Sequence, residues 1–391
     1  MNEPEPAKAP TPRSPRFETL DLLRGVACVM IVLLHSTMVQ ISAGRESSKS
    51  IFSLALLATS RMAIGVPIFF VISGYCISAS ADACRRGKFG AGSYFVRRIR
   101  RIYPPYLIAL CFTIVFMGLV VWLFGNQVAY PEGGAIRDPR TLTLSQWLGN
   151  VTLTEEWRHH VFGAPKRYVM VVAWSLCYEE QFYIVMGLLL LLMANRLFTG
   201  AAVVSLMVGC IAFAVPAESI RGFFFDLRWF TFAGGILLYW QVNYGGRWAW
   251  RVAPAVYLAV FVGAVGLNPS GALMLRTGHP TRETDLLLMG ATCFGLWLIH
   301  PWDKQIVRSR WLAPLVFCGR HCYSLYLVHS PIVTVVSKIM YDAGFRSDMA
   351  TVCVVVPACL SLSLLVASGF YRLVERRFIN SPLAGRSTSA G

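Results

Sequence analysis

The stretch FETLDLLRGVACVMIVLLHSTMVQI, residues 17–41, decides how the chain folds. It opens with an acid and a base, Asp21 and Arg24, and then runs apolar until His35. At about 100° per residue, the step from Arg24 to His35 makes three turns plus about 20°, so the three polar side chains share one helix face. Ionisable groups at membrane depth cost about 2.5 to 3.5 kcal/mol and normally face a bundle or cavity. The stretch predicts a polar line inside a membrane bundle; the alternative is a buried histidine bonded to a neighbouring helix.

The composition of the whole chain indicates the same class of protein. Of its 391 residues, 55% are hydrophobic and 14% are charged, and the mean hydropathy is +0.55. Soluble domains carry about 25% charged residues, so we expect an all-α polytopic membrane protein. The formal net charge of +16 comes from basic residues in short loops, where they set topology, and we expect no nucleic-acid partner. The eleven cysteines show no metal-ligand spacing, and we expect no metal.

Apolar runs long enough to cross a bilayer, which takes about 20 residues, predict a bundle of about ten transmembrane helices without an appended soluble domain. They lie near residues 20–41, 62–80, 102–125, 169–193, 197–215, 223–242, 249–267, 284–301, 311–340 and 350–373. The ninth run is long enough to be bent or subdivided, and Pro331 offers a break point.

Lys and Arg predict the orientation of the bundle. The connection at 81–101 is densely basic, and the positive-inside bias places it and both termini in the cytoplasm. We expect a disordered cytoplasmic tail at 1–16, a membrane domain at 17–378 and a cytoplasmic tail at 379–391. The loop at 126–168 is then external. Its aromatic residues are candidates for stacking on a sugar or for an interfacial belt: Trp147, Trp157 and Tyr168.

The RRIRRIYPPY stretch, residues 97–106, carries four arginines at the entrance of the third expected helix, where Tyr103, Pro104 and Pro105 are expected to turn the chain into the membrane. Residues three apart project from one helix face. The arginines form two such pairs: Arg97 with Arg100, and Arg98 with Arg101. Paired guanidinium groups suit a polyphosphate, such as that of a nucleotide-bearing coenzyme. Topology signals and contacts with lipid phosphate are the alternative.

Two further stretches carry ionisable groups inside expected helices. WSLCYEEQFY, residues 174–183, holds Glu179 and Glu180, which lie about 100° apart on a helix, so that only one can face a cavity. The alternative is that both carboxylates lie near the external end of the helix and neither faces a cavity. CGRHCYSLYLVHSP, residues 318–331, holds His329 before a proline, either as a partner for carbonyls that a kink frees or as a site residue. The structural role is favoured on the sequence alone.

Together these stretches resemble the membrane-bound acyltransferase 3 family. The resemblance runs in family order from about residue 16 to 378. It rests on five motifs: FETLDLLRGVACVMIVLLH, VPIFFVISGYCIS, RRIRRIYPPY, WSLCYEEQFY and CYSLYLVHSP. The last motif has Cys322 where the family pattern has serine, and the terminal VERRF lacks a proline common in relatives, which weakens any role for Glu375.

The resemblance implies transfer of an acyl group, commonly acetyl from acetyl-CoA, to a carbohydrate or lipid-linked sugar at the surface of a bacterium, and location in the cytoplasmic (inner) membrane among lipids. The candidate catalytic residues are His35, Glu179, Asp21 and Arg24. The candidate coenzyme-binding residues are Arg97, Arg98, Arg100, Arg101 and Tyr103. The candidate substrate-binding residues are Trp174, Tyr326 and His329.

The mechanism expected from these residues begins with acyl-CoA entering from the cytoplasm. An ordinary histidine titrates near 6.5, which suits a general base at neutral pH. His35 is expected to deprotonate the acceptor hydroxyl or to carry the acyl group itself. The alternative from another class is a transporter of a polar or lipid-linked solute that uses the same intramembrane residues as a relay. It explains the arginine pairs less well.

Overall fold

The computed structural model describes residues 17–42, 50–87, 90–131, 134, 136–267 and 282–379. Within these ranges the regular structure is helical and contains no strand, which confirms the all-α prediction. All ten expected runs are helical over most of their length. The expected tail at 1–16 and almost all of the expected tail at 379–391 lie outside the described residues.

The chain divides into two compact units, which are described separately. Unit 1 comprises residues 1–27, 63–95 and 177–317, and unit 2 comprises residues 28–62, 96–176 and 318–391. Within the described residues, four α-helices contribute to both units: α1 (Thr19–Ser42), α4 (Gly90–Phe124), α8 (Ala173–Met193) and α16 (Ala313–Arg320). Arg24 and His35 therefore belong to one uninterrupted helix, as the sequence predicted.

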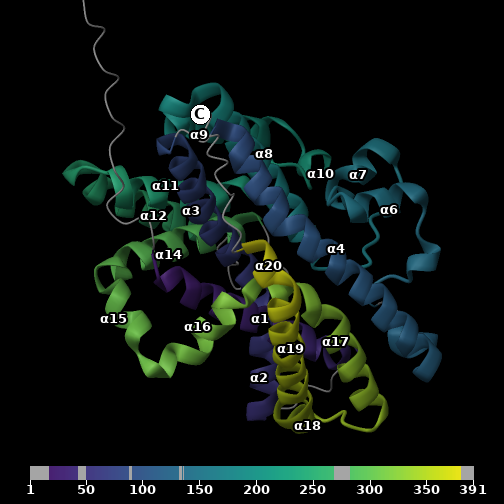
Figure 1. Ribbon diagram of the computed structural model, residues 1–391. Coiled ribbons are helices and arrows are strands. Elements are labelled where there is room, and N and C mark those ends of the chain that lie inside the picture. The colour runs from purple at the N-terminus through teal and green to yellow at the C-terminus, as the bar shows by residue number, and fades with distance from the viewer. Residues whose placement is uncertain are drawn as a thin grey trace, which may run out of the picture. The chain divides into compact units, whose positions relative to one another are not determined.

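Unit 1 is a group of helices in which α3 and α11 approach most closely (Figure 1). Its main helices are α3 (Gly65–Arg86), α9 (Leu197–Ala214), α11 (Trp229–Tyr244), α12 (Arg247–Leu267) and α14 (Arg282–Ile299). A Cβ added to Gly74 would lie 2.1 Å from the Phe232 carbonyl oxygen, and one on Gly235 would lie 2.0 Å from the Val71 carbonyl oxygen. The two glycines allow the backbones to touch, as small residues do between membrane helices.

Shorter elements complete unit 1. They are α10 (Ala217–Ile220), α15 (Asp303–Arg308), and the 3₁₀ turns η3 (Ala194–Arg196), η5 (His300–Trp302) and η6 (Arg310–Leu312). Asp303 begins α15 and caps α1. Its carboxylate accepts from the Thr19 backbone N–H at 2.7 Å and from the Glu18 N–H at 3.0 Å. A carboxylate at the N-terminus of a helix satisfies amide donors that the helix leaves open.

Unit 2 is built around α17 and α19, which lie side by side (Figure 1). Its helices are α2 (Ile51–Ser60), α5 (Asn126–Ala129), α6 (Leu144–Val151), α7 (Glu155–Phe162), α17 (Cys322–Asp342), α18 (Asp348–Ala350), α19 (Val356–Phe370) and α20 (Arg376–Ile379). A π-helical turn precedes α19 (η7, Thr351–Val355) and another follows it (η8, Tyr371–Glu375). The turns η1 (Met62–Ile64) and η2 (Pro139–Thr141) and the helix α16 (Ala313–Arg320) complete the chain.

The third expected helix begins earlier than the sequence predicted. We expected Pro104 and Pro105 to turn the chain into the membrane, but α4 continues through both from Gly90 to Phe124. Proline removes a backbone donor and usually kinks a helix. Here the carbonyls of Arg100 and Arg101 lose their i+4 backbone donors. Next to them, the Tyr323 hydroxyl donates to the carbonyl of Ile102 at 2.9 Å.

The segment at 126–168, expected as an external loop, is largely helical and packs along α4. The Tyr106 hydroxyl donates to the Asn150 carbonyl at 2.6 Å, and the Tyr103 hydroxyl donates to the Thr152 carbonyl at 3.2 Å. The segment therefore lies beside the part of α4 that comes after the arginines. Sequence spacing could not reveal this, because the contacts join residues more than forty positions apart.

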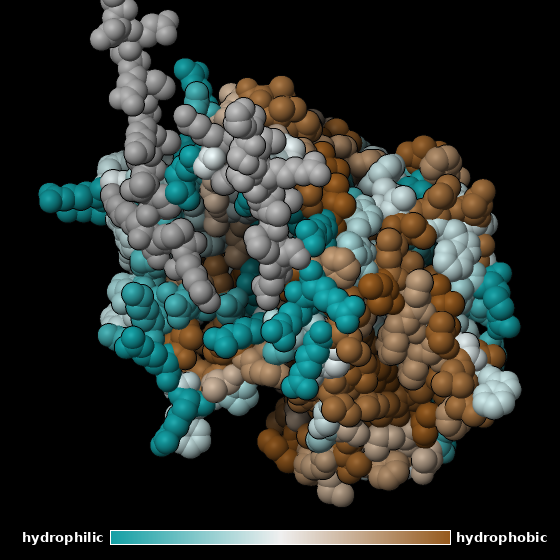
Figure 2. Space-filling view, viewed as in Figure 1, coloured by the Kyte–Doolittle hydropathy of each residue, from teal (hydrophilic) through white to brown (hydrophobic). Residues whose placement is uncertain are grey.

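Six helical stretches of the described chain are long and apolar enough to cross a membrane. They are Thr19–Ile41, Ile51–Arg86, Gly90–Phe124, Ala173–Ala212, Arg247–Gly266 and Asp348–Ile379. Two expected spans merge in Ala173–Ala212, and α11, with 16 residues, is short of the usual length of about 20. Figure 2 shows broad apolar areas on the visible face, and exposed side chains include Trp122 at 79% and Leu192 at 75%. The protein is an integral membrane protein.

Candidate active site

The centre of the candidate site in unit 2 is a pair of histidines from α1 and α17. His35 Nδ1 lies 3.0 Å from His329 Nε2, and the two ring planes are within 9° of parallel. The ring centroids are 5.2 Å apart, as expected for a hydrogen bond in the plane of both rings and too far for rings stacked face to face. The structure thus joins two residues that the sequence singled out separately, 294 positions apart.

The hydrogen-bond partners of His329 fix where the protons lie in this pair. His329 Nδ1 lies 3.0 Å from the Leu325 carbonyl, which can only accept, so His329 carries its proton on Nδ1. A neutral His329 then accepts at Nε2, and His35 donates from Nδ1. This tautomer leaves the lone pair of His35 on Nε2. Within the described residues, the structure gives His35 no hydrogen bond beyond the one at Nδ1.

The hydroxyl of Tyr326 is held by its own partners in unit 2. It donates to the Val172 carbonyl at 2.9 Å and lies 2.6 Å from the Ser175 hydroxyl. The Tyr326 ring is 6.0 Å from that of His329. Tyr326 is thus fixed beside the histidine pair, and Trp174, the other aromatic candidate for substrate binding, is half-buried at the start of α8.

The remaining candidates on α1, Asp21 and Arg24, form an ion pair in unit 1. Arg24 Nη1 lies 2.8 Å from an Asp21 carboxylate oxygen, and Arg24 Nη2 lies 2.9 Å from the Cys76 sulfur of α3. Both charged side chains are about one quarter exposed, at 23% and 28%. The two opposite charges therefore compensate each other at the start of the first membrane helix, while part of each polar side chain stays exposed.

Glu179 belongs to a polar group that the sequence did not predict. Its carboxylate accepts from the Ser73 hydroxyl of α3 at 3.0 Å and from the Tyr183 hydroxyl of α8 at 2.5 Å. Ser73 lies in the VPIFFVISGYCIS motif, which in the sequence supported only the family resemblance. Its partner is 106 positions away, so only the packing of α3 against α8 within unit 1 could reveal the pair.

The four arginines lie on one helix, α4, but not with equal exposure. Arg97 and Arg101 are exposed, Arg100 is half-buried and Arg98 is 8% exposed. At about 100° per residue, Arg97, Arg100 and Arg101 lie within an arc of about 100° around the helix. Arg98 lies beyond one end of this arc, on the buried side of the helix. The two equivalent pairs expected from the sequence become one exposed group of three arginines with a fourth packed into unit 2.

Glu375 is a buried acid whose place in unit 2 the sequence did not indicate. It is 3% exposed and accepts from the Ser324 backbone N–H at 3.0 Å and from the Ser324 hydroxyl. Arg101 is close enough to act electrostatically on its carboxylate. Glu375 therefore caps the N-terminus of α17 and links it to the arginine group. An acid followed by two arginines at the end of an apolar run was the available signal.

Ion pairs stabilise the helices that come after α4. Arg158 Nε lies 2.6 Å from a Glu155 oxygen, with both side chains buried. Tyr168, a candidate for sugar stacking, donates through its hydroxyl to Glu156 at 2.5 Å.

At the surface, hydrogen bonds from Arg140 lower the pKa of Asp138. The described ranges contain no group of three or more His, Cys, Asp or Glu side chains able to hold a metal ion.

The candidate residues therefore fall into two sets. The set in unit 2 contains His35, Arg97, Arg98, Arg100, Arg101, Tyr103, Trp174, Tyr326 and His329, and the set in unit 1 contains Asp21, Arg24 and Glu179. The helices α1, α4 and α8 each carry residues of both units.

Comparisons with known proteins agree with this arrangement of motifs. The sequence profile of the acyltransferase 3 family, described as an acyltransferase domain, matches residues 17–371. The chain is 27% identical to a protein named as a membrane-bound transacylase, BcsY, of Komagataeibacter xylinus, over 96% of this chain and 87% of that one. It is 24% identical to the acyltransferase MdmB of Streptomyces mycarofaciens, over 92% and 90% of the two chains.

A third relative is longer than the matched region. The O-acetyltransferase OatA of Staphylococcus aureus is 24% identical over 96% of this chain, and the match covers 59% of that protein. No solved structure matches the chain.

Proposed function

We propose, from the premise that this chain belongs to the acyltransferase 3 family of integral membrane enzymes, that it moves an acyl group, expected to be acetyl, from acyl-CoA to a carbohydrate hydroxyl. The acceptor is at the cell surface or on its way there. Transfer of an acyl group is the activity of the family, and one relative is named an O-acetyltransferase. Family membership favours this reading over a transporter.

The observation that carries the proposal is the hydrogen bond between His35 and His329. With its proton on Nδ1, His35 offers Nε2 as the base. The acceptor hydroxyl gives its proton to Nε2 while its oxygen attacks the thioester carbonyl carbon. The carbon–sulfur bond then breaks, and the imidazolium returns the proton to the coenzyme thiolate. The products are the ester and free CoA.

The protonated His35 has a partner throughout this cycle. Its Nδ1–H continues to donate to His329 Nε2, so the charge that develops on His35 is stabilised by a hydrogen bond. The carboxylate of a serine protease triad supports its histidine in the same way. If His35 carries the acyl group instead, the same lone pair on Nε2 attacks the thioester first.

The arginine group of α4 supports the choice of coenzyme. Arg97, Arg100 and Arg101 present guanidinium groups on one arc of the helix, and guanidinium binds phosphate oxygens in a bidentate manner. Tyr103 comes next on the same helix, beside the carbonyl of Thr152. We place this group on the cytoplasmic side of the inner membrane, where acyl-CoA is found and where basic loops concentrate.

Radiolabel transfer tests the proposal. Membranes that contain the wild type, His35→Ala or the control His160→Ala are incubated with labelled acetyl-CoA, and label in surface carbohydrate is counted. His160 is an exposed histidine of α7 outside the proposed machinery. Label with the wild type and the control but not with His35→Ala is the expected result. Equal label from His35→Ala would remove His35 from the chemistry.

A further inference from the structure

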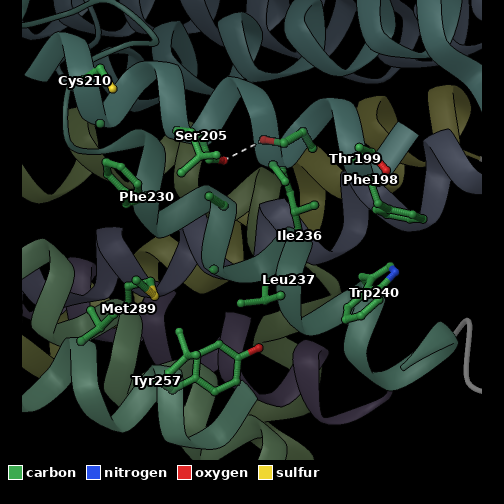
Figure 3. A pocket seen from close by; sticks show the side chains of 18 of the residues that line it. Phe198, Thr199, Ser205, Cys210, Phe230, Ile236, Leu237, Trp240, Tyr257 and Met289 are labelled. Atoms are coloured by element: carbon green, nitrogen blue, oxygen red, sulfur yellow. Dashed lines mark hydrogen bonds between the residues drawn. The ribbon is translucent and has the colours of Figure 1, made fainter. Parts of the chain in front are cut away.

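Unit 1 contains an apolar cavity of about 1290 Å³, and none of its lining residues belongs to the candidate active site. Figure 3 shows the lining side chains, which come from α9, α11, α12 and α14. The cavity exceeds the roughly 300 to 1,000 Å³ typical of small-molecule sites. Its occupant must therefore be large or extended.

Small residues on α9 and α11 leave this space open. Gly209, Ala201 and Ala233 all line the cavity. A Cβ added to Gly209 would meet nothing closer than the Phe230 ring at 3.5 Å, which is ordinary contact. Small residues usually draw membrane helices together, but here the neighbouring helices do not close on them.

The cavity reaches from the membrane-facing surface to the core of unit 1. Several lining residues are exposed, among them Leu206 at 72% and Val256 at 42%, and these two belong to helices that can span a membrane. Other lining residues are buried, with Ile236 at 5%, Met289 at 7% and Tyr257 at 1%. Lipid hydrocarbon next to Leu206 therefore has a path inward.

Two hydroxyl groups of the lining, those of Ser205 and Tyr257, already have partners within the protein. The Ser205 hydroxyl donates to the Ala201 carbonyl at 2.8 Å and accepts from Trp229 Nε1 at 2.9 Å. The Tyr257 hydroxyl donates to Gln241 Oε1 at 3.0 Å. A ligand that brought polar groups here would lose hydrogen bonds with water and gain few in return. These contacts favour a hydrocarbon occupant.

The shape of the lining matches an extended chain. Along α9 it runs from Phe198 to Ala214, which is about 24 Å at about 1.5 Å per residue. The hydrocarbon core of a bilayer is about 30 Å thick. Two leaflets share that thickness, so one lipid tail of about 15 Å along the membrane normal would fill the part of the cavity nearest its headgroup.

Cationic residues gather at one end of the cavity. The Phe198 ring lies 5.8 Å from that of Tyr239 and 5.7 Å from that of Tyr244, so α9 begins where α11 ends. Arg196 directly precedes α9, and Arg247 begins α12 just after α11. Both arginines are exposed. A phosphate group would be attracted to this end, as basic residues attract lipid headgroups at membrane surfaces.

We propose that this cavity binds the acyl chains of a membrane phospholipid, with its phosphate near Arg196 and Arg247. The lipid fills a space that would otherwise be empty between α9, α11 and α12, and so holds these helices at their observed separation. This site is independent of the proposed transfer reaction, and either proposal can fail without the other.

Photo-crosslinking in a defined bilayer tests the site. The full chain is reconstituted in vesicles of phosphatidylethanolamine and phosphatidylglycerol, a fraction of which carries a diazirine on one acyl chain. After irradiation, adducts are located by peptide mass spectrometry. We expect adducts on Ile236 and Met289, which lipid around the protein cannot reach because both are buried. Adducts confined to exposed residues such as Leu206 would overturn the proposal.

A matched pair of glycine variants separates filling of the cavity from a general effect on the helices. Gly209→Leu places a side chain in the cavity and should lower labelling of Ile236 about tenfold, a factor equal to 1.4 kcal/mol of binding. Gly263→Leu adds the same side chain to open space on α12 and should leave labelling unchanged. Equal labelling of Ile236 in both variants would contradict the proposal. The wild-type adduct map decides alone if Gly209→Leu does not fold.

Competition identifies the lipid. Added polyprenyl phosphate should leave the labelling of Ile236 and Met289 unchanged when phospholipid is in large excess. If a small amount of polyprenyl phosphate abolished that labelling, the cavity would be a site for a lipid-linked substrate and the phospholipid proposal would be wrong.

Discussion

Asp82 in unit 1 and His35 in unit 2 are both ionisable groups inside apolar helices, but their hydrogen-bonding states are opposite. The Asp82 carboxylate is fully buried and accepts from four side chains: Arg85, Arg86, Tyr239 and Tyr244. His35 has a partner on one nitrogen, and the tautomer fixed by His329 leaves the lone pair of the other available. A buried carboxylate that accepts hydrogen bonds from several helices holds those helices together. A histidine whose second ring nitrogen has a free lone pair can instead take up a proton. The comparison predicts that substitution of Asp82 should affect folding, and that substitution of His35 should affect turnover.

The largest effect is expected from removing the base. His35→Ala should lower kcat by about 10² to 10⁴-fold, the usual contribution of a general base. Acyl-CoA should still stabilise the variant against heat, since the arginines of α4 are unchanged. Single-turnover transfer and thermal unfolding with and without acyl-CoA check both parts. Loss of folded protein would contradict the distinction between the two regions.

Asp82→Ala should act on folding instead. Breaking a buried ion pair by removing one partner costs about 3 to 5 kcal/mol, and we expect the lower end here because Arg85 and Arg86 are 12% and 26% exposed. We expect a lower melting temperature and less protein in the membrane, with kcat per folded molecule near that of the wild type. Thermal unfolding in detergent, with activity normalised to monodisperse protein, measures this. Normal stability with low kcat would reverse the roles we assign.

His329 is a positioning residue, because it contacts the proposed base His35. Its substitution should have an effect between those expected for His35 and Asp82. His329→Ala should lower kcat about ten- to hundredfold, since a hydrogen bond to a charged group contributes about 1.5 to 3 kcal/mol. His329→Gln offers an amide oxygen that can accept from His35 Nδ1 and should recover part of the rate. A purely structural role would predict similar kcat for Gln and Ala after normalisation to folded protein, and the comparison of the two variants tests this.

The arginine group should affect binding of the donor alone. Replacing Arg97 and Arg101 with alanine should raise KM for acyl-CoA about tenfold, which corresponds to about 1.4 kcal/mol of lost binding, and leave KM for the acceptor unchanged. Replacing Arg308 and Arg310, which are exposed arginines of unit 1 outside the group and outside the proposed lipid site, is the control. An equal rise in both Michaelis constants would argue against a coenzyme site on α4.

The smallest effect is expected at a surface ion pair. Arg140 lowers the pKa of Asp138 through hydrogen bonds, and its side chain is 70% exposed. Because the folded-state pKa lies below the unfolded value of about 3.9, the pair stabilises the fold above about pH 4 and loses this effect as pH falls through the folded-state pKa. Asp138→Asn should cost less than about 0.5 kcal/mol at neutral pH. Melting temperatures at pH 7 and pH 3 test the sign.

Much of the fold could be predicted from the sequence because membrane helices are recognisable by the length and composition of their apolar runs. The helical character of all ten apolar runs followed from hydropathy alone. The helices α6 and α7 did not, because both are short and α7 buries two charges, Glu155 and Arg158, as an ion pair. The continuation of α4 through Pro104 and Pro105 was missed because proline usually marks a helix end.

The site was predictable residue by residue but not in its contacts. His35, His329 and Glu179 stood out as ionisable groups within apolar runs. The bonds of His35 to His329 and of Glu179 to Ser73 join residues far apart in the chain, and no local pattern specifies them. Asp82 was missed, although arginines three and four positions later were a usable signal.

The π-helical turn from Tyr371 to Glu375 makes the length of the chain less critical here than in the regular helix before it. Such a turn accommodates one residue more than an α-helix would. Deleting a single residue there would restore regular winding while the residues on either side keep the direction in which they face. Glu375 could then still reach Ser324 and cap α17. A one-residue deletion in this turn is therefore expected to be better tolerated than one within α19, which would rotate everything that follows by about 100°.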